Sequence, residues 1–129
     1  MKALILTLAA ALLPGFALAQ PKSGEQVYKE VCFARHATKV EKAPQLGERK
    51  AWAPLIKEGQ HVLTAHAWVG ARNMPPRGGK PDLELEEFAR AVAYMAREAG
   101  GRWQDPDAAM LAKIRAEEKK RIAQMKSKK

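Results

Sequence analysis

The chain has 129 residues, a formal net charge of +9 and a single cysteine. One cysteine excludes an intramolecular disulfide. The sequence contains no recognisable set of nucleophile, base and orienting residue, so it gives hydrolytic catalysis no support and the chain is not predicted to be an enzyme.

The first 19 residues have the features of a secretory signal peptide. Lys2 gives a positive start, residues 3–13 form an apolar stretch, and Ala17 to Ala19 provide a small-residue cleavage site. A bilayer span needs about 20 apolar residues, which favours a cleaved signal over an uncleaved anchor, the alternative reading. We therefore expect export to a bacterial periplasm, with residues 20–100 forming one small domain and residues 101–129 a basic helical tail.

A first helix is expected to begin at Ser23, which makes a capping box with Gln26. Tyr28 and Cys32 lie four residues apart, so they would share one face of this helix. The helix would deliver Cys32 to the edge of any group bound nearby.

A loop and two short helices are expected next. Pro44 and Gly47 would interrupt a helix. The pattern then predicts short helices over residues 54–60 and 62–69, the second of them ended by Gly70.

A longer helix is expected after Pro81, with Asp82 as its N-cap. Its apolar residues recur at three- and four-residue spacing, which makes one apolar stripe. They are Leu85, Phe88, Val92 and Met95. No segment alternates with period two, so the domain is predicted to be all-α.

The C-terminal segment is predicted to be a basic helix. Asp105 to Asp107 signals a helix start with Pro106 in the first turn. Residues 101–129 hold nine Lys or Arg against four Asp or Glu, a net charge of +5. Such a helix can be merely solvated, can steer the chain toward an acidic partner, or can bind an anionic membrane surface. Nucleic acid is not expected as a partner of an exported chain.

Two motifs carry chemistry. Cys32 to His36 reads Cys-Phe-Ala-Arg-His, a covalent haem-attachment motif in every position but one, with Arg35 where a second cysteine would stand. A leftover cysteine in an exported chain implies an intermolecular disulfide, a reactive thiol or a covalent adduct, and its place four residues before His36 favours the adduct. Met74 lies on a Pro- and Gly-rich turn that offers little packing reason for a large apolar side chain. Histidine and thioether sulfur ligate iron in cytochromes c, so His36 and Met74 are the candidate axial ligands.

With these motifs the chain resembles the small class I bacterial c-type cytochromes, and among them the cytochrome c5 type. The resemblance covers roughly residues 22–100 as islands in order: Gly24-x-x-x-Tyr28-x-x-x-Cys32-x-x-x-His36, Ala43 to Gly47, Ala51 to Pro54, Met74 to Gly79 and Ala91 to Met95. Two positions depart from the family pattern. Arg35 replaces the second thioether cysteine, and Lys39 stands where glycine is common.

The resemblance implies a cytochrome c-like helical domain around one haem c, acting in electron transfer with a redox partner protein. Cys32 would form a single thioether, and the Pro44 carbonyl would accept a hydrogen bond from His36 and fix its tautomer. Trp52 would pack against the cofactor, although ordinary core packing is equally open for a tryptophan. A domain of roughly 80 residues has marginal folding stability without a disulfide, a metal or a comparable stabilising group. A buried haem would be such a group.

The resemblance also implies a helix crossing, in which the helix carrying Tyr94 passes the first helix at Gly24. Met95, in the apolar stripe, is expected to be a core residue rather than a rival ligand. His61 and His66 are expected at the surface or in loops.

Arg35 keeps alternatives open. The enzymes that attach haem read the peptide motif, so loading could fail and leave a haem-free helical module that acts through its basic tail as a binding protein. A haem protein from which Met74 dissociates, working as a sensor or peroxidase, is a third reading. A zinc site built from Cys32 and the histidines lacks the paired short spacings of structural zinc sites.

Overall fold

The computed structural model describes residues 14–15, 17–37 and 42–128. The apolar stretch of the expected signal peptide and Lys39 lie outside this part of the chain. The described part folds into helices with no strand, which confirms the all-α prediction. No helix among these residues is long and apolar enough to cross a membrane.

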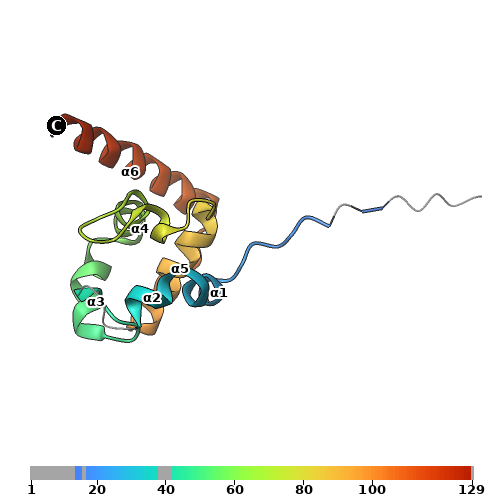
Figure 1. The fold of residues 1–129 in the computed structure, drawn as a ribbon, viewed down its shortest axis with the longest axis horizontal. Helices are drawn as coiled ribbons and strands as arrows, with labels where there is room; N and C mark the ends of the chain where they lie inside the picture. Colours follow the sequence, from blue (N-terminus) through green and yellow to red (C-terminus); the bar gives the residue numbers. More distant parts are fainter. Residues whose placement is uncertain (1–13, 16, 38–41, 129) are drawn as a thin grey trace, which may run out of the picture.

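The helical elements follow one another in the order shown in Figure 1. They are α1 Gly24–Val27, η1 Tyr28–Cys32, α2 Phe33–His36, α3 Arg49–Lys57, α4 Gln60–Val69, η3 Pro76–Gly79, α5 Leu85–Glu98 and α6 Ala108–Ser127. The first three run on as one rod of helix, and η3 is a short 3-10 turn in the loop after α4. Residues 17–22 extend away from the helical body (Figure 1).

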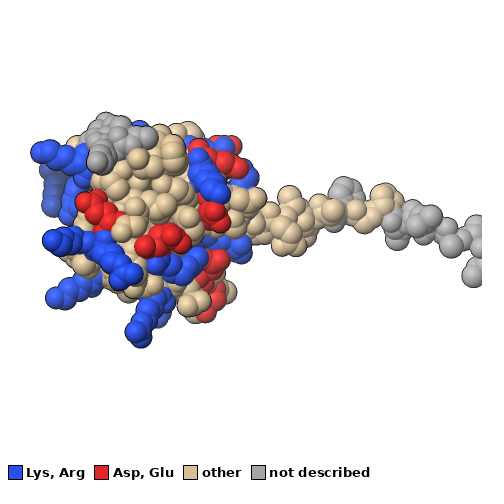
Figure 2. All heavy atoms as spheres, turned by 90° about the horizontal axis from the view of Figure 1, so that it is seen from below, with Lys and Arg blue, Asp and Glu red and all other residues tan. Residues whose placement is uncertain are grey.

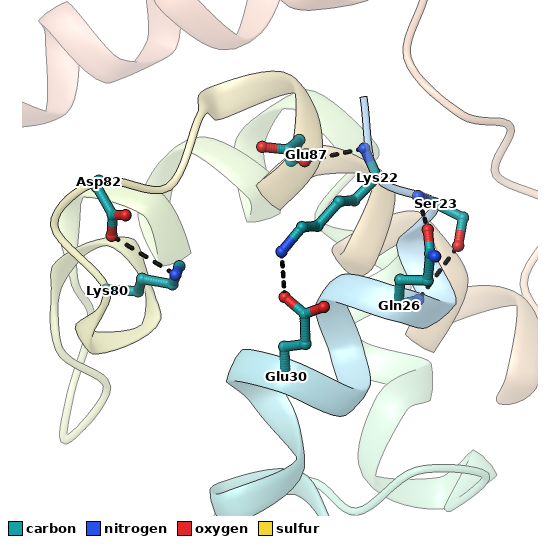
Figure 3. A network of polar contacts seen from close by, with 7 residues as sticks. All are labelled: Lys22, Ser23, Gln26, Glu30, Lys80, Asp82 and Glu87. Carbon is teal, nitrogen blue, oxygen red and sulfur yellow. Dashed lines mark hydrogen bonds and ion pairs between the residues drawn. The ribbon is translucent and has the colours of Figure 1, made fainter. Parts of the chain in front are cut away.

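The start of α1 is fixed by a network of polar contacts (Figure 3). Ser23 and Gln26 form the predicted capping box in both directions. The backbone N–H of Lys22 donates to Glu87 of α5 at 2.9 Å, and its ammonium group pairs with Glu30. The first helix is therefore tied at its beginning to α5.

The crossing of α1 and α5 occurs at Gly24, as the resemblance implied. A Cβ atom at this position would lie 2.2 Å from the carbonyl oxygen of Arg90 and 2.9 Å from Cβ of Tyr94. Neither the backbone of α5 nor a Cβ atom can move aside as a flexible side-chain end could. Only glycine lets the two helices approach this closely.

Replacing Gly24 by alanine is expected to destabilise the protein by about 1–3 kcal/mol or more, because the added methyl group forces the helices apart. The midpoint of chemical denaturation should fall accordingly. Glu25→Ala, an exposed neighbour in the same turn, serves as the control and should change stability by about 0.5 kcal/mol or less. Equal stability of the Gly24 variant and the control would contradict the close crossing.

The segment Tyr28–Cys32 is a π-helix, which the sequence pattern did not predict. The N–H of Phe33 bonds to the carbonyl of Tyr28, five residues earlier. A π turn holds about one residue more than an α turn, and so rotates the residues that follow it relative to those before it. The change of register falls directly before the segment that carries His36.

Four predicted helix starts were wrong by a few residues, and among them α4 begins at Gln60 rather than at residue 62. Helix α3 begins at Arg49 rather than Pro54, which lies inside it and costs it one hydrogen bond. Helix α5 is capped at Glu84 rather than Asp82, because Leu83 is buried by a turn that closes back on Lys80. In α6 the cap is Asp107, which accepts a 2.8 Å bond from Met110, so the proline of this segment precedes the cap.

Candidate haem site

An apolar cavity of about 450 Å³ lies between the end of the first helical rod and the loop after α4. Its apolar lining comes from α3, α4 and α5, namely Trp52, Leu55, Leu63, Ala67, Val92 and Met95. His36, Pro44 and Met74 line it as well, together with Arg35. A wider hollow of about 690 Å³ adjoins it around residues 42–48. The smaller cavity is the one that both candidate ligands reach.

His36 is the last residue of α2 and is buried, with only 7% of its surface exposed. Its Nδ1 lies 2.7 Å from the carbonyl oxygen of Pro44, the contact that the resemblance implied. Nδ1–H donates in this bond, which leaves Nε2 unprotonated as a potential metal ligand. Burial lowers the pKa of His36, and the nearby Arg35 lowers it further, while the bond to Pro44 acts in the opposite direction. The ring is thus held neutral, as metal ligation requires.

The loop that carries Pro44 is held by hydrogen bonds from both sides. The Gln45 side-chain amide donates to the carbonyl of Arg35 at 3.1 Å and to that of Ala43 at 2.8 Å. The backbone N–H of Leu46 donates to the carbonyl of His36 at 2.7 Å. These bonds fix the acceptor that orients the imidazole.

Trp52 lies on α3 with 3% of its surface exposed. Its indole N–H donates to the carbonyl of Gln45 at 2.9 Å, and its ring centre lies 6.1 Å from that of His36. The indole is therefore fully satisfied and presents an apolar surface to the cavity, beside the imidazole.

Met74 is half-buried in the loop between α4 and η3. Its N–H and carbonyl pair with Ala71 at 2.9 and 3.2 Å, an isolated antiparallel bridge. The following turn packs against the first rod, since a Cβ atom on Gly78 would lie 2.9 Å from Val31. This loop is thus supported on both sides of the methionine.

Cys32 is a free thiol with 4% of its surface exposed, and it is not among the residues that line the cavity. Burial raises its pKa to about 12, so the folded chain holds a neutral thiol. Arg35, at the place of the missing cysteine, does line the cavity, and its guanidinium lies 3.8 Å from where a Cβ atom of Gly79 would stand. Of the predicted site residues, the structure brings His36, Pro44, Trp52 and Met74 around one cavity. Cys32, which the first helix was expected to deliver to the edge of a bound group, is not among the lining residues.

Sequence reasoning did not predict several of the lining residues, including His66 and Arg121. His66 of α4 is half-buried at the cavity rather than a surface or loop residue, and its Nε2 lies 3.3 Å from Glu117 of α6. Arg121 of α6 also lines the cavity. A signal for Arg121 exists, because it lies seven residues after Ile114 and so shares a helical face with that fully buried residue.

The cavity matches the chemistry of haem, a flat apolar macrocycle that carries two carboxylates. Its interior is apolar, and its volume lies within the range of about 300–1,000 Å³ usual for ligand sites. The charged lining residues are four cations and one carboxylate, namely Arg35, Lys42, Arg72, Arg121 and Glu58. Among the described residues, no group of three or more His, Cys, Asp or Glu could hold a bare metal ion.

Comparisons with known proteins agree with this site. The family model described as cytochrome C oxidase, cbb3-type, subunit III matches residues 19–95. The chain is 36% identical over 77 residues to cytochrome c-555 of Chlorobaculum thiosulfatiphilum, covering 57% of this chain and 90% of that one. It is 32% identical to cytochrome c5 of Azotobacter vinelandii over 77 residues, 58% of this chain and 93% of the relative.

A solved structure is similar as well. It is a chain from the crystal structure of an electron transfer complex of nitrite reductase with cytochrome c, with a TM-score of 0.56 and 41% sequence identity. The match covers 59% of this chain and 93% of that one. Helix α6 lies beyond the residues that the family model matches.

Proposed function

The chain belongs to the cytochrome c family, and on that premise we propose that it is a periplasmic electron carrier with one haem c held between His36 and Met74. When bound, haem supplies an iron centre that takes up and releases one electron. The observation that carries the proposal is the convergence of these two residues, from distant parts of the sequence, on one apolar cavity. The similar solved structure contains a cytochrome c in an electron transfer complex, and the proposed electron transfer needs no catalytic residue of the protein.

The protein residues would bind and orient the group. His36 offers Nε2 because Pro44 engages its other ring nitrogen. Met74 would supply its thioether sulfur as the second protein ligand of the iron, which favours the reduced state and raises the reduction potential. Trp52 would pack against the macrocycle and keep water away from the imidazole, since its polar N–H is already bonded to the backbone.

We further propose that Cys32 forms the single thioether. One tether suffices to retain a cofactor, because a linked ligand has an effective concentration in the millimolar range even with a flexible linker. The buried, neutral thiol of the folded chain is a poor nucleophile. We therefore expect the link to form before the chain folds around it.

The partner is proposed to be a redox protein, since the similar solved structure contains a cytochrome c in complex with nitrite reductase. Lys and Arg side chains stand around the edge of the face shown in Figure 2, with Asp and Glu between them. With a net charge of +9, or +8 without Lys2 of the proposed signal peptide, the chain is expected to associate faster with an acidic partner than with a neutral one. This advantage should shrink in high salt. An anionic membrane surface is a second candidate for the basic tail.

The arrangement of the chain is part of the same proposal: residues 1–19 as a signal peptide, 20–100 as the cytochrome c-like domain and 101–129 as the tail. Export is what would bring the chain into the compartment where haem is attached to such motifs.

The test is expression of the full chain, with its first 19 residues, in a host that matures c-type cytochromes. We expect a reduced spectrum typical of low-spin haem and an intact mass that keeps the haem after denaturation. Cys32→Ser is the control, because removing the thiol should release haem on denaturation. A colourless, folded helical protein would contradict the proposal and favour the haem-free binding module.

A further inference from the structure

Helix α6 is packed against the domain and is not a free solvated helix. It lies beside α4 in Figure 1, and its own Ile114 is fully buried. The indole N–H of Trp68 donates to Glu118 at 3.1 Å, and His66 pairs with Glu117 at 3.3 Å. Two acidic side chains of a basic helix are thus used to hold it on α4.

The same face of α6 brings Arg121 to the cavity that His36 and Met74 line. Arg121 lies four residues after Glu117 and three after Glu118, so it shares a helix face with the two carboxylates that bind α4. Their interactions therefore set which way this face of α6 is turned. Its Nε atom is buried and has no hydrogen-bond partner, and Arg121 takes part in none of the ion pairs found among the described residues.

A buried guanidinium nitrogen without an acceptor is costly. Arg90 also has an unpartnered Nε, but its guanidinium is bonded to Glu86 through Nη2. Glu58 is the one carboxylate among the residues that line the cavity, against four cations there. Among the described residues, the buried Nε of Arg121 at the cavity wall therefore has no acceptor, in a cavity whose charged lining is mostly cationic.

We propose that α6 completes the cofactor site and that the Arg121 guanidinium binds a propionate carboxylate of the haem. This inference rests on the proposed haem function and adds a residue from outside the part that the family model matches, residues 19–95. A guanidinium binds a carboxylate through two parallel hydrogen bonds, which suits a partly buried site. Three other cations, Arg35, Lys42 and Arg72, also line the cavity. Lys42 and Arg72 are exposed and can stay hydrated, and no nitrogen of Arg35 is among the buried atoms without a hydrogen-bond partner.

The charge has a consequence for electron transfer. Reduction removes one positive charge from the iron centre, so a nearby cation in a medium of low dielectric constant favours the reduced form. Arg121 would also neutralise the propionate, whose negative charge favours the oxidised form. The positive charge of Arg121 thus offsets the propionate charge at the iron and raises the reduction potential.

The experiment compares holoproteins of the full chain: the wild type, Arg121→Gln, Arg121→Lys and the control Arg115→Gln, which removes the same charge from an exposed position of α6. We expect the midpoint potential to fall in Arg121→Gln and to fall less in Arg121→Lys, which keeps the charge but not the planar fork. The propionate-bending bands of the resonance Raman spectrum should shift in both Arg121 variants. Arg115→Gln should leave both measurements at the wild-type values.

The possible failures are distinct. Equal potentials and equal Raman bands in Arg121→Gln and Arg115→Gln, with haem bound in both, would overturn the role of Arg121 and leave the proposed function standing. If Arg121→Gln does not accumulate as a folded protein, the Raman bands of Arg121→Lys decide, and unshifted bands overturn the inference. A wild-type chain without haem overturns the proposed function and this inference together.

Discussion

Met74→Leu is expected to convert the ferric protein from low-spin to high-spin iron and to lower its reduction potential by a few tenths of a volt. Leucine fills nearly the same volume but offers no electron pair, so the sixth coordination position loses its protein ligand. Axial ligands set haem potentials over a range of about 0.8 V, and thioether ligation lies toward its upper part. Visible spectroscopy of the ferric protein and a spectroelectrochemical titration measure the two effects.

The matched control is Met95→Leu. Met95 lines the same cavity from α5, has 2% of its surface exposed and is the other methionine among the lining residues. Its place in the apolar stripe makes it a packing residue, and an exchange of methionine for leucine in a core usually costs less than about 1.5 kcal/mol. We expect the low-spin spectrum to persist in this variant. Loss of the low-spin spectrum in Met95→Leu, with Met74→Leu unaffected, would mean that the ligand had been assigned to the wrong methionine.

The framework of the site could be predicted through the resemblance to the class I c-type cytochromes, which implied both the contact between His36 and Pro44 and the helix crossing at Gly24. His36 needs an acceptor on one ring nitrogen, and a proline carbonyl in the next loop provides it. The helix crossing at Gly24 likewise needs one residue type at one position, since no other residue lacks a Cβ atom. Each feature depends on a few residues with strict geometric demands, so matching those residues to the family pattern was enough to predict it.

The parts that were missed depend on packing between distant elements. The sequence predicted that α6 is a helix, but the apolar stripe of α6 does not indicate which other element the helix packs against. Glu117 and Glu118 are unremarkable in a charged helix until His66 and Trp68 of α4 lie opposite them. The π-helix was missed for the same reason. It lies between Gly24, which crosses α5, and His36, which bonds to Pro44, and contacts of this kind are not visible in the local sequence pattern.

Arg35→Cys is expected to restore a second thioether and to raise the yield of haem-loaded protein. Arg35 lines the cavity on α2, one helical turn from Cys32, where the attachment motif would place the second cysteine. Each thiol adds across a vinyl double bond, sulfur bonding to one carbon and hydrogen to the other. The saturated vinyl group leaves the conjugated system, so the reduced pyridine complex should absorb at a shorter wavelength than that of the wild type. A second link also restricts the unfolded chain, which should raise the denaturation midpoint.

Ala34→Cys is the control, since it adds a thiol one residue away at an exposed position that the motif does not use. It should leave the absorption of the pyridine complex at the wild-type wavelength. If Arg35→Cys binds haem at that wavelength too, its thiol does not reach the vinyl group. The π turn before Phe33 would then have moved position 35 away from the edge of the haem. In that case the backbone conformation, and not the identity of residue 35, would limit the protein to one thioether.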